Sequence, residues 1–89
     1  MPLLKETLPE TAKAYKQMTD TVLSTDNFLD LKTKELIAVV AAVLVRCQAC
    51  VDLYLPKAYE AGCTREEIAE ALAVAACISA GSQVEWTKI

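Results

Sequence analysis

Apolar residues recur at helical spacing along most of this chain, and the pattern predicts a series of helices. The first begins at Pro9, a residue suited to the first turn of a helix, and ends among the turn-forming residues 24–27. Between these limits Ala12, Tyr15 and Val22 lie on one face, while lysines and an aspartate occupy the other. This segment therefore has the pattern of an amphipathic helix.

The second predicted helix follows Asp30, whose carboxylate suits an N-cap position. From residue 36 to residue 45 this helix has no polar side. A helix that is apolar all round has to be surrounded by other elements, and a chain of 89 residues offers too few neighbours to do this. We therefore expect a symmetric homo-oligomer with this helix at or near the interface.

The third predicted helix carries Cys47 and Cys50 near its start and stops at Gly62. Pro56 lies inside it and lacks the backbone N–H that would bond to the carbonyl of Asp52. We therefore expect a kink or a break in the helix at this proline.

The last predicted helix opens with the sequence TREE at residues 64–67, a capping box. In such a box the side chains of Thr64 and Glu67 satisfy each other's unpaired backbone amides. Small residues make up the inner face of this helix, and the Gly-Ser pair at residues 81–82 closes it. Together the four helices predict an all-α fold in a single domain, residues 1–89.

Composition and charge exclude several classes of protein. Hydrophobic residues make up 54% of the chain, with only two glycines and three prolines, which argues against disorder. The formal net charge is −3 and the basic residues are scattered, so we expect no nucleic-acid partner. The first residues lack the apolar stretch of a secretory signal, and the longest apolar run is about half of the roughly 20 residues that span a membrane. These features predict a cytoplasmic protein without a membrane partner.

Four cysteines provide the candidate chemistry, and two of them, Cys47 and Cys50, form a Cys-x-x-Cys motif. At a helix N-terminus the dipole and a cation such as Arg46 favour the thiolate, which is the form that attacks peroxides and disulfides. The alternatives are half of a zinc site or two small buried apolar residues. The chain has no histidine, and Cys63 and Cys77 do not form a second close pair. We therefore expect no metal or other cofactor, and we interpret Cys63 and Cys77 as structural.

Glu35 is the last charged residue before the apolar segment, so we expect its carboxyl to be partly buried. Burial raises a carboxyl pKa toward neutrality, where the group can exchange protons with a thiol. The alternative is a glutamate that only compensates the dipole of its helix. A straight helix would hold Glu35 and Cys50 roughly 22 Å apart. A shared site therefore requires a turn near Val45 and Arg46.

A resemblance to a known family is carried by three segments, which read LKTKELIA at residues 31–38, RCQAC at residues 46–50 and AYEAGCTREEIAEA at residues 58–71. Over about residues 28–82 the chain resembles the carboxymuconolactone decarboxylase and alkylhydroperoxidase D-like family. The glutamate twelve residues before the first cysteine of the pair makes the resemblance specific.

This resemblance implies an all-α fold, assembly as a homotrimer or homohexamer, and electrons drawn from a lipoyl or other dithiol protein. It also implies that Cys50 is the attacking thiol, that Cys47 is the resolving partner and that Glu35 belongs to a proton relay. The family's histidine position is Tyr54 in this chain. A phenol is a poor base at neutral pH, although it can donate a hydrogen bond to a thiolate. Tyr54 is interpreted either as part of the site or as an aromatic residue packed in a subunit interface.

The hypothesis that follows is a thiol–disulfide oxidoreductase that reduces a peroxide or a partner disulfide and is re-reduced by a dithiol protein or a small thiol. An alternative is a non-catalytic oligomeric binding scaffold of the same fold. The decarboxylase branch of the family is a third choice, because its chemistry does not use the cysteine pair. The helix dipole favours Cys47 as the activated thiol, whereas the resemblance favours Cys50.

Overall fold

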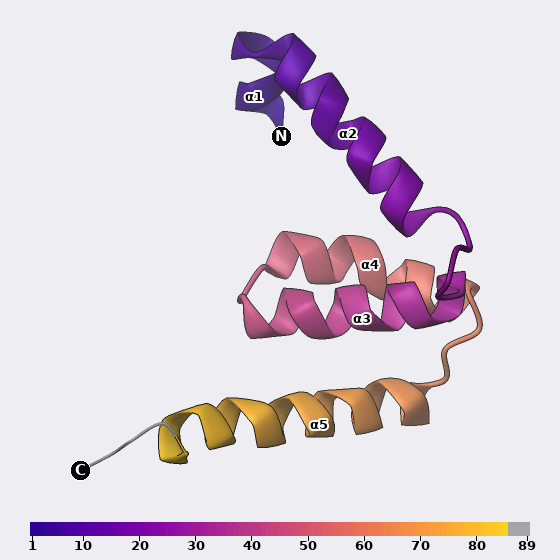
Figure 1. The fold of residues 1–89 in the computed structure, drawn as a ribbon, viewed down its shortest axis with the longest axis vertical. Helices are drawn as coiled ribbons and strands as arrows, with labels where there is room; N and C mark the ends of the chain where they lie inside the picture. The colour runs from indigo at the N-terminus through magenta and orange to yellow at the C-terminus, as the bar shows by residue number, and fades with distance from the viewer. Residues whose placement is uncertain (86–89) are drawn as a thin grey trace. The chain divides into compact units, whose positions relative to one another are not determined.

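The computed structural model describes residues 1–85, which consist of helices joined by turns (Figure 1). The described residues contain no strand, which confirms the all-α prediction. The helices are α1 (Pro2–Thr7), α2 (Pro9–Leu23), α3 (Leu31–Leu44), α4 (Gln48–Glu60) and α5 (Arg65–Val84). The chain forms two compact units, Met1–Leu31 and Lys32–Ile89.

The first unit is built from α1 and α2. Helix α2 begins at Pro9, as predicted, and buries Ala12. Helix α1 is an additional element, in which Pro2 occupies the first helical position. At its end the amide of Leu8 donates to the carbonyl of Leu4 at 2.7 Å, and Pro9 then starts the next helix directly. Six residues carry too little periodicity to predict a helix, so the sequence pattern did not reveal α1.

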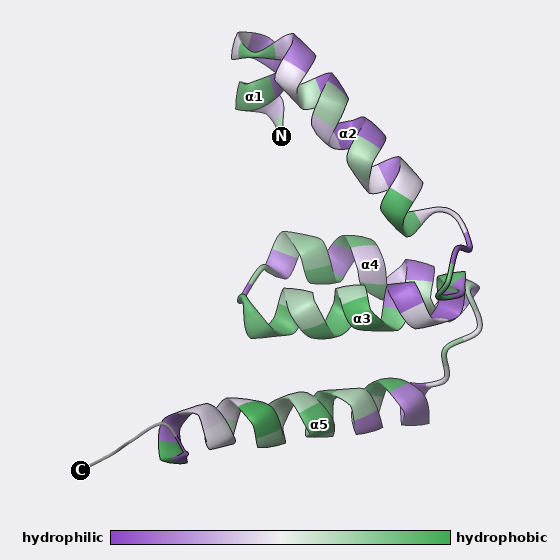
Figure 2. Cartoon of the chain, viewed as in Figure 1, coloured by the Kyte–Doolittle hydropathy of each residue, from purple (hydrophilic) through white to green (hydrophobic). Residues whose placement is uncertain are grey.

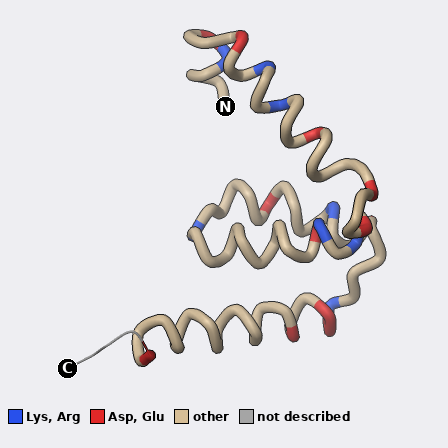
Figure 3. Tube along the Cα trace, in the orientation of Figure 1, with Lys and Arg blue, Asp and Glu red and all other residues tan. Residues whose placement is uncertain are grey.

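Helix α3 begins at Leu31, immediately after Asp30, where the sequence places the N-cap. The amide of Leu31 donates to a carboxylate oxygen of Asp26 at 2.6 Å, so the side chain of Asp26 satisfies a backbone donor at this helix start. Charged residues of α3 are confined to its first turns, and the rest of the helix is apolar (Figures 2 and 3). One stripe of the helix is buried and consists of Glu35, Val39 and Ala42.

Helix α4 continues through Pro56 without a break. Of the expected kink or break, the break is therefore wrong, because packing on both sides of the proline holds the helix in place. Ala58 is completely buried, and Leu55 packs against the same cluster. Burial of these apolar side chains offsets the roughly 3 kcal/mol that a proline costs inside a helix. The helix ends at Glu60, and Gly62 follows with a φ of 103°, a left-handed conformation that glycine adopts without strain.

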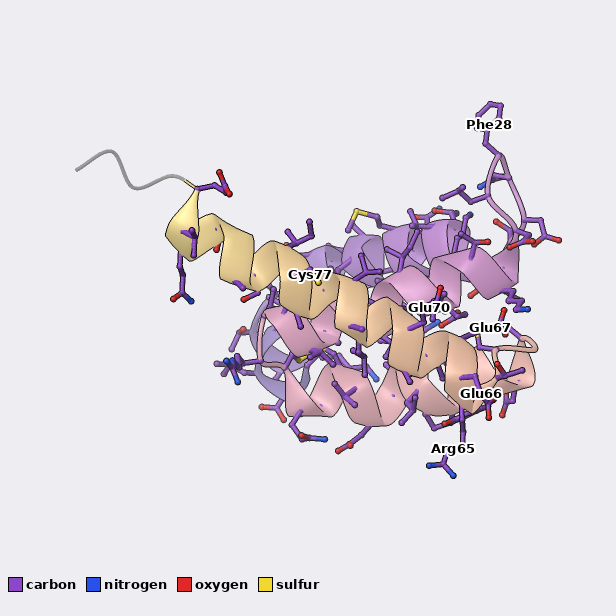
Figure 4. All side chains as sticks on the ribbon, turned by 90° about the horizontal axis from the view of Figure 1, so that it is seen from below. Phe28, Arg65, Glu66, Glu67, Glu70 and Cys77 are labelled. Carbon is purple, nitrogen blue, oxygen red and sulfur yellow. A yellow bond between two sulfur atoms is a disulfide. The ribbon has the colours of Figure 1, made fainter. Side chains whose placement is uncertain are left out.

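Helix α5 starts with the predicted capping box, which is confirmed in both directions. The amide of Glu67 donates to the hydroxyl of Thr64 at 3.1 Å, and the amide of Thr64 donates to the Glu67 carboxylate at 2.9 Å. The Glu67 carboxylate also pairs with the Lys32 ammonium at 2.9 Å. Figure 4 shows Arg65, Glu66 and Glu67 together at this end of the helix.

The C-terminal end of α5 lies beyond the predicted Gly-Ser stop, since the helix continues to Val84. The amide of Glu85 donates to the carbonyl of Gly81 at 2.8 Å, so the glycine takes part in a helical bond instead of ending the helix. By length and composition alone, α5 is the one helix in residues 1–85 that is apolar enough to cross a membrane. Core helices of soluble proteins meet the same criterion, and α5 contributes Ile68 to the core of the second unit.

That core is centred on four buried residues from α3, α4, the following turn and α5. They are Val39, Ala58, Cys63 and Ile68, with Leu36, Tyr54, Leu55 and Leu72 packed around them. The cluster holds the three helices of the second unit together and so determines where the start of α4, with its cysteine pair, is placed.

Candidate functional site

A sharp turn between α3 and α4 positions the cysteine pair. Helix α3 ends at Leu44, and Arg46 adopts a φ of 60°. The amide of Arg46 donates to the carbonyl of Val43 at 3.1 Å, and the amide of Cys47 donates to the carbonyl of Ala42 at 2.9 Å. The turn that the sequence required near Arg46 is therefore present, and it reverses the chain so that α4 packs against α3.

Cys47 and Cys50 are joined by a disulfide, with their Cα atoms 5.2 Å apart. Cys47 is the N-cap residue of α4, and its sulfur accepts a hydrogen bond from the amide of Cys50 at 3.2 Å. A backbone donor and a helix N-terminus both favour negative charge on this sulfur when the pair is reduced. The pair therefore has the geometry of a dithiol that can cycle with its disulfide.

Glu35 is buried in the second unit, with only 3% of its surface exposed. Burial raises the pKa of this carboxyl above its usual value of 4.5, and the ammonium of Lys57 acts in the opposite direction. One carboxyl oxygen, Oε2, is buried without a hydrogen-bond partner among residues 1–85. Glu35 is thus a carboxyl whose protonated form is favoured by burial and whose Oε2 has a spare position for a further hydrogen bond.

Tyr54 and Lys57 lie along α4 beyond the cysteine pair. Tyr54 is half-buried against the core, and the Lys57 ammonium lies 5.5 Å from the centre of its ring. Cys50, Tyr54 and Lys57 are spaced four and then three residues apart, so they share one face of the helix. The structure thus groups Lys57 with both Tyr54 and Glu35, and it places Tyr54 one turn from Cys50.

Lys57 is a site residue that the sequence reasoning missed. Its spacing from Cys50 and Tyr54 was visible in the sequence, but an exposed lysine on a helix is ordinarily a solvated charge. Its relation to Glu35 depends on how α3 packs against α4 and could be found only in the structure.

The other two cysteines have different surroundings. Cys63 is buried in the core, where its thiol lies 3.5 Å from the carbonyl oxygen of Lys32, in keeping with a structural role. Cys77 lies on α5 and is exposed in the single chain, so the expected burial is not observed there (Figure 4). Within residues 1–85, no group of three or more cysteine, aspartate, glutamate or histidine side chains is arranged to hold a metal ion.

The helical fold and the sulfur pair at the start of α4 define a small all-α protein with a redox-capable Cys-x-x-Cys motif. The chain matches the model of the carboxymuconolactone decarboxylase family over residues 9–87. It therefore belongs to this family, which confirms the resemblance noted in its sequence.

Two similar proteins support this assignment. The first is "Uncharacterized protein 4 in cox locus" of Paracoccus denitrificans, which is 36% identical over 88 residues covering 92% of this chain and 79% of the relative. The second is a protein of Methanobacterium thermoautotrophicum with a solved crystal structure. It is 45% identical, covers 90% of this chain and 91% of its own, and superposes with a TM-score of 0.80.

Proposed function

We propose that this protein is a thiol–disulfide oxidoreductase that cycles Cys47 and Cys50 between dithiol and disulfide. The observation that carries the proposal is the disulfide at the start of α4, with the amide of Cys50 directed at the sulfur of Cys47. This arrangement stabilises a thiolate and keeps the two sulfurs within bonding distance. Membership of the carboxymuconolactone decarboxylase family is consistent with the same chemistry.

In the peroxide-reducing cycle, the roles follow the family resemblance. The Cys50 thiolate attacks one peroxide oxygen, the O–O bond breaks, and the leaving oxygen takes a proton as an alcohol or water. Neutral Glu35 is the proposed proton source, because its burial favours the protonated form. Cys47 then attacks the sulfenic acid on Cys50, which releases water and forms the disulfide. A donor dithiol returns two electrons and two protons and restores the pair.

Tyr54 is the proposed hydrogen-bond donor to the reacting thiolate, since its phenol can donate but is a poor base at neutral pH. Its position one turn beyond Cys50 on the same face of α4 is compatible with that role.

A redox titration with thiol counting tests the proposal. The protein is equilibrated in mixtures of reduced and oxidised dithiothreitol, and accessible thiols are counted after acid quenching. We expect one reversible two-electron couple, which is lost in Cys47→Ser and in Cys50→Ser and kept in the matched control Cys77→Ser. A pair that stays reduced or oxidised across the whole range contradicts the proposal.

A binding scaffold without catalysis is the second candidate, and the packing of Tyr54 favours it. The ring of Tyr54 lies against the core and under the Lys57 ammonium, as a purely structural aromatic residue would. Cysteines that do not exchange with dithiothreitol would favour this candidate.

We also propose a homotrimer or homohexamer in the cytoplasm, with a dithiol protein or a small thiol as electron donor. Several large apolar side chains of the second unit are exposed in the single chain, among them Ile37 at 52% and Ile78 at 68%. Large apolar side chains exposed in this number on one small unit favour a protein interface.

A further inference from the structure

An open hollow lies beside the cysteine pair, where α3 ends and α4 begins. Its volume is about 320 Å³, at the lower end of the size of small-molecule sites. The lining residues are Ala42, Val43, Arg46, Cys47, Gln48 and Val51. Three of these side chains are apolar, one is a cation, and one is the first sulfur of the redox pair. The hollow reaches Cys47, whereas Cys50 is not part of its lining.

Arg46 supplies the charge of this hollow. It occupies a left-handed conformation, with a φ of 60°, in which glycine is the favoured residue. Its guanidinium forms no salt bridge within residues 1–85, and Asp52, the next carboxylate along the sequence, accepts a hydrogen bond from the Gln48 side chain at 2.8 Å. A cation without a carboxylate partner at the edge of a hollow is suited to an anionic ligand.

The hydrogen bonding of the pair indicates which sulfur exchanges with external thiols. The Cys47 sulfur accepts the amide of Cys50, so negative charge is favoured on Cys47 whenever the pair is reduced. A stabilised and accessible thiolate is the one that attacks an external disulfide. By microscopic reversibility, an external thiolate attacks the same sulfur when the pair is oxidised.

We propose that this hollow is the docking site of a small thiol bearing a carboxylate, which Arg46 holds while the thiol exchanges with Cys47. The inference rests on the proposed oxidoreductase function and adds the chemical class of the reductant. The donor thiolate attacks the Cys47 sulfur, the Cys47–Cys50 bond breaks, and Cys50 leaves as a thiolate. A second donor thiolate attacks the sulfur of the bound donor and releases Cys47. Two donor thiols become one disulfide, and two electrons and two protons pass to the pair.

Three two-carbon thiols of different charge test the role of Arg46. Mercaptoacetate is an anion, 2-mercaptoethanol is neutral and cysteamine is a cation, and each is used to reduce the oxidised protein. The rate of Arg46→Gln is divided by the wild-type rate for each thiol, so that the thiol's own reactivity cancels. We expect a loss of about fivefold with mercaptoacetate, the size of one close charge pair in water, and no loss with 2-mercaptoethanol. Cysteamine should react faster with the variant.

Two matched variants complete the experiment. Arg46→Lys keeps the charge and should retain the preference for mercaptoacetate. Arg65→Gln removes the same charge beyond the far end of α4 and should leave all three rates unchanged, because α4 separates the two sites by about 20 Å. A further check uses the disulfide of mercaptoacetate, which should react faster with the Cys47 thiol of Cys50→Ser than with the Cys50 thiol of Cys47→Ser.

The outcomes separate this inference from the function on which it rests. Equal rate ratios for the three thiols overturn the docking site, while reduction by 2-mercaptoethanol still supports an oxidoreductase. Preferential reaction at Cys50 also overturns the docking site. If none of the three thiols reduces the pair, the docking site is overturned, whereas the oxidoreductase function is overturned only if dithiothreitol also fails to reduce the pair.

Discussion

Glu35 shows at the scale of one residue how the fold prepares a side chain for proton transfer. A carboxyl on an exposed helix face would ionise near its usual pKa of 4.5. The side chain of Glu35 is buried, and one of its oxygens has no hydrogen-bond partner among residues 1–85. The desolvation of the charged form is the larger effect, and the attraction of Lys57 reduces it. The burial could be predicted, because Glu35 directly precedes the apolar segment of its helix.

The raised pKa of Glu35 makes stability depend on pH. The folded chain binds this proton more tightly than the unfolded chain, so the contribution is present below pH 4.5 and is lost as the pH rises through the raised value. Glu35→Gln should therefore gain free energy of unfolding relative to wild type as the pH increases from 4 to 7.5. Urea denaturation at both pH values measures this gain, with the exposed Glu60→Gln as control. An equal difference at the two pH values would contradict a raised pKa of Glu35.

Lys57 gives the second prediction at this scale. Its ammonium lowers the pKa of Glu35, so Lys57→Met should move that pKa further upward, whereas Lys57→Arg should not. Carboxyl titration followed by NMR or by isotope-edited infrared spectroscopy measures the shift. An unchanged Glu35 titration in Lys57→Met would show that the two groups do not interact.

Tyr54 gives the third prediction, because it separates a working hydrogen-bond donor from a packing residue. Tyr54→Phe keeps the ring beneath Lys57 and removes the hydroxyl. If the hydroxyl bonds to the thiolate, the thiolate pKa should rise by about one unit, and peroxide consumption at neutral pH should slow. Tyr54→His introduces a base that titrates near pH 6.5 and should accelerate turnover. Thiolate absorbance against pH and peroxide assays with dithiothreitol compare the three proteins, and identical curves would assign Tyr54 to packing.

At the scale of single elements, the sequence predicted the helices best where their ends carry specific chemistry. Pro9 and the Thr64 capping box mark the starts of α2 and α5, and both starts are confirmed. The continuation of α4 through Pro56 and of α5 through Gly81 could not be predicted, because tertiary packing overrides local helix propensity there. The turn at Arg46 was predicted only from the distance between Glu35 and Cys50, because one straight helix would hold these residues too far apart to share a site.

The capping box of α5 should be measurable in stability. Thr64→Ala removes the hydroxyl that accepts the amide of Glu67 and should cost about 1 kcal/mol of unfolding free energy. The Thr64 amide and Lys32 hold the pKa of Glu67 below 4.5. The ionised carboxylate therefore stabilises the fold above pH 4.5, and this stabilisation is lost as the pH falls through the lowered pKa. Thr21→Ala, at an exposed position within α2, is the control. A cost no larger than that of the control would contradict the cap.

In the turn before α4, a substitution at Arg46 should keep or raise the stability, whereas Thr64→Ala should lower it. Arg46 holds a left-handed conformation, so Arg46→Gly should leave the free energy of unfolding unchanged or raise it by up to about 1 kcal/mol. Arg46→Ala keeps the backbone strain and should bring no gain. Thermal denaturation of the three proteins measures the difference, and a clear loss in Arg46→Gly would show that the arginine side chain stabilises the turn.

At the scale of the whole molecule, the apolar surface is larger than one chain of this size can bury. Large side chains on α3 and α5 are exposed, although these helices also build the core of the second unit. The apolar run of α3 was predicted to need a partner, and the exposed Ile37 agrees with that physical argument. The apolar pattern alone does not give the number of subunits, because that number depends on the angle between copies and not on apolar content.

Assembly should therefore fail when a charge is placed on this surface. Ile78→Glu on α5 should dissociate a trimer or hexamer into smaller species, since a carboxylate buried in an interface costs several kcal/mol. Gln83→Glu adds the same charge to the same helix and serves as control. Light scattering coupled to size-exclusion chromatography measures the mass. A wild-type protein that is monomeric at micromolar concentration would contradict the oligomer.

Because Cys63 is buried, the rate at which its thiol is alkylated measures how often the core of the second unit opens. With the Cys47–Cys50 pair oxidised, two thiols remain, and only 4% of Cys63 is exposed whereas Cys77 is open to solvent. An alkylating reagent should label Cys77 at once, while Cys63 has to wait until the core around Val39 and Ile68 separates. The slow labelling phase of the native sequence thus reports the free energy of that opening without any introduced probe.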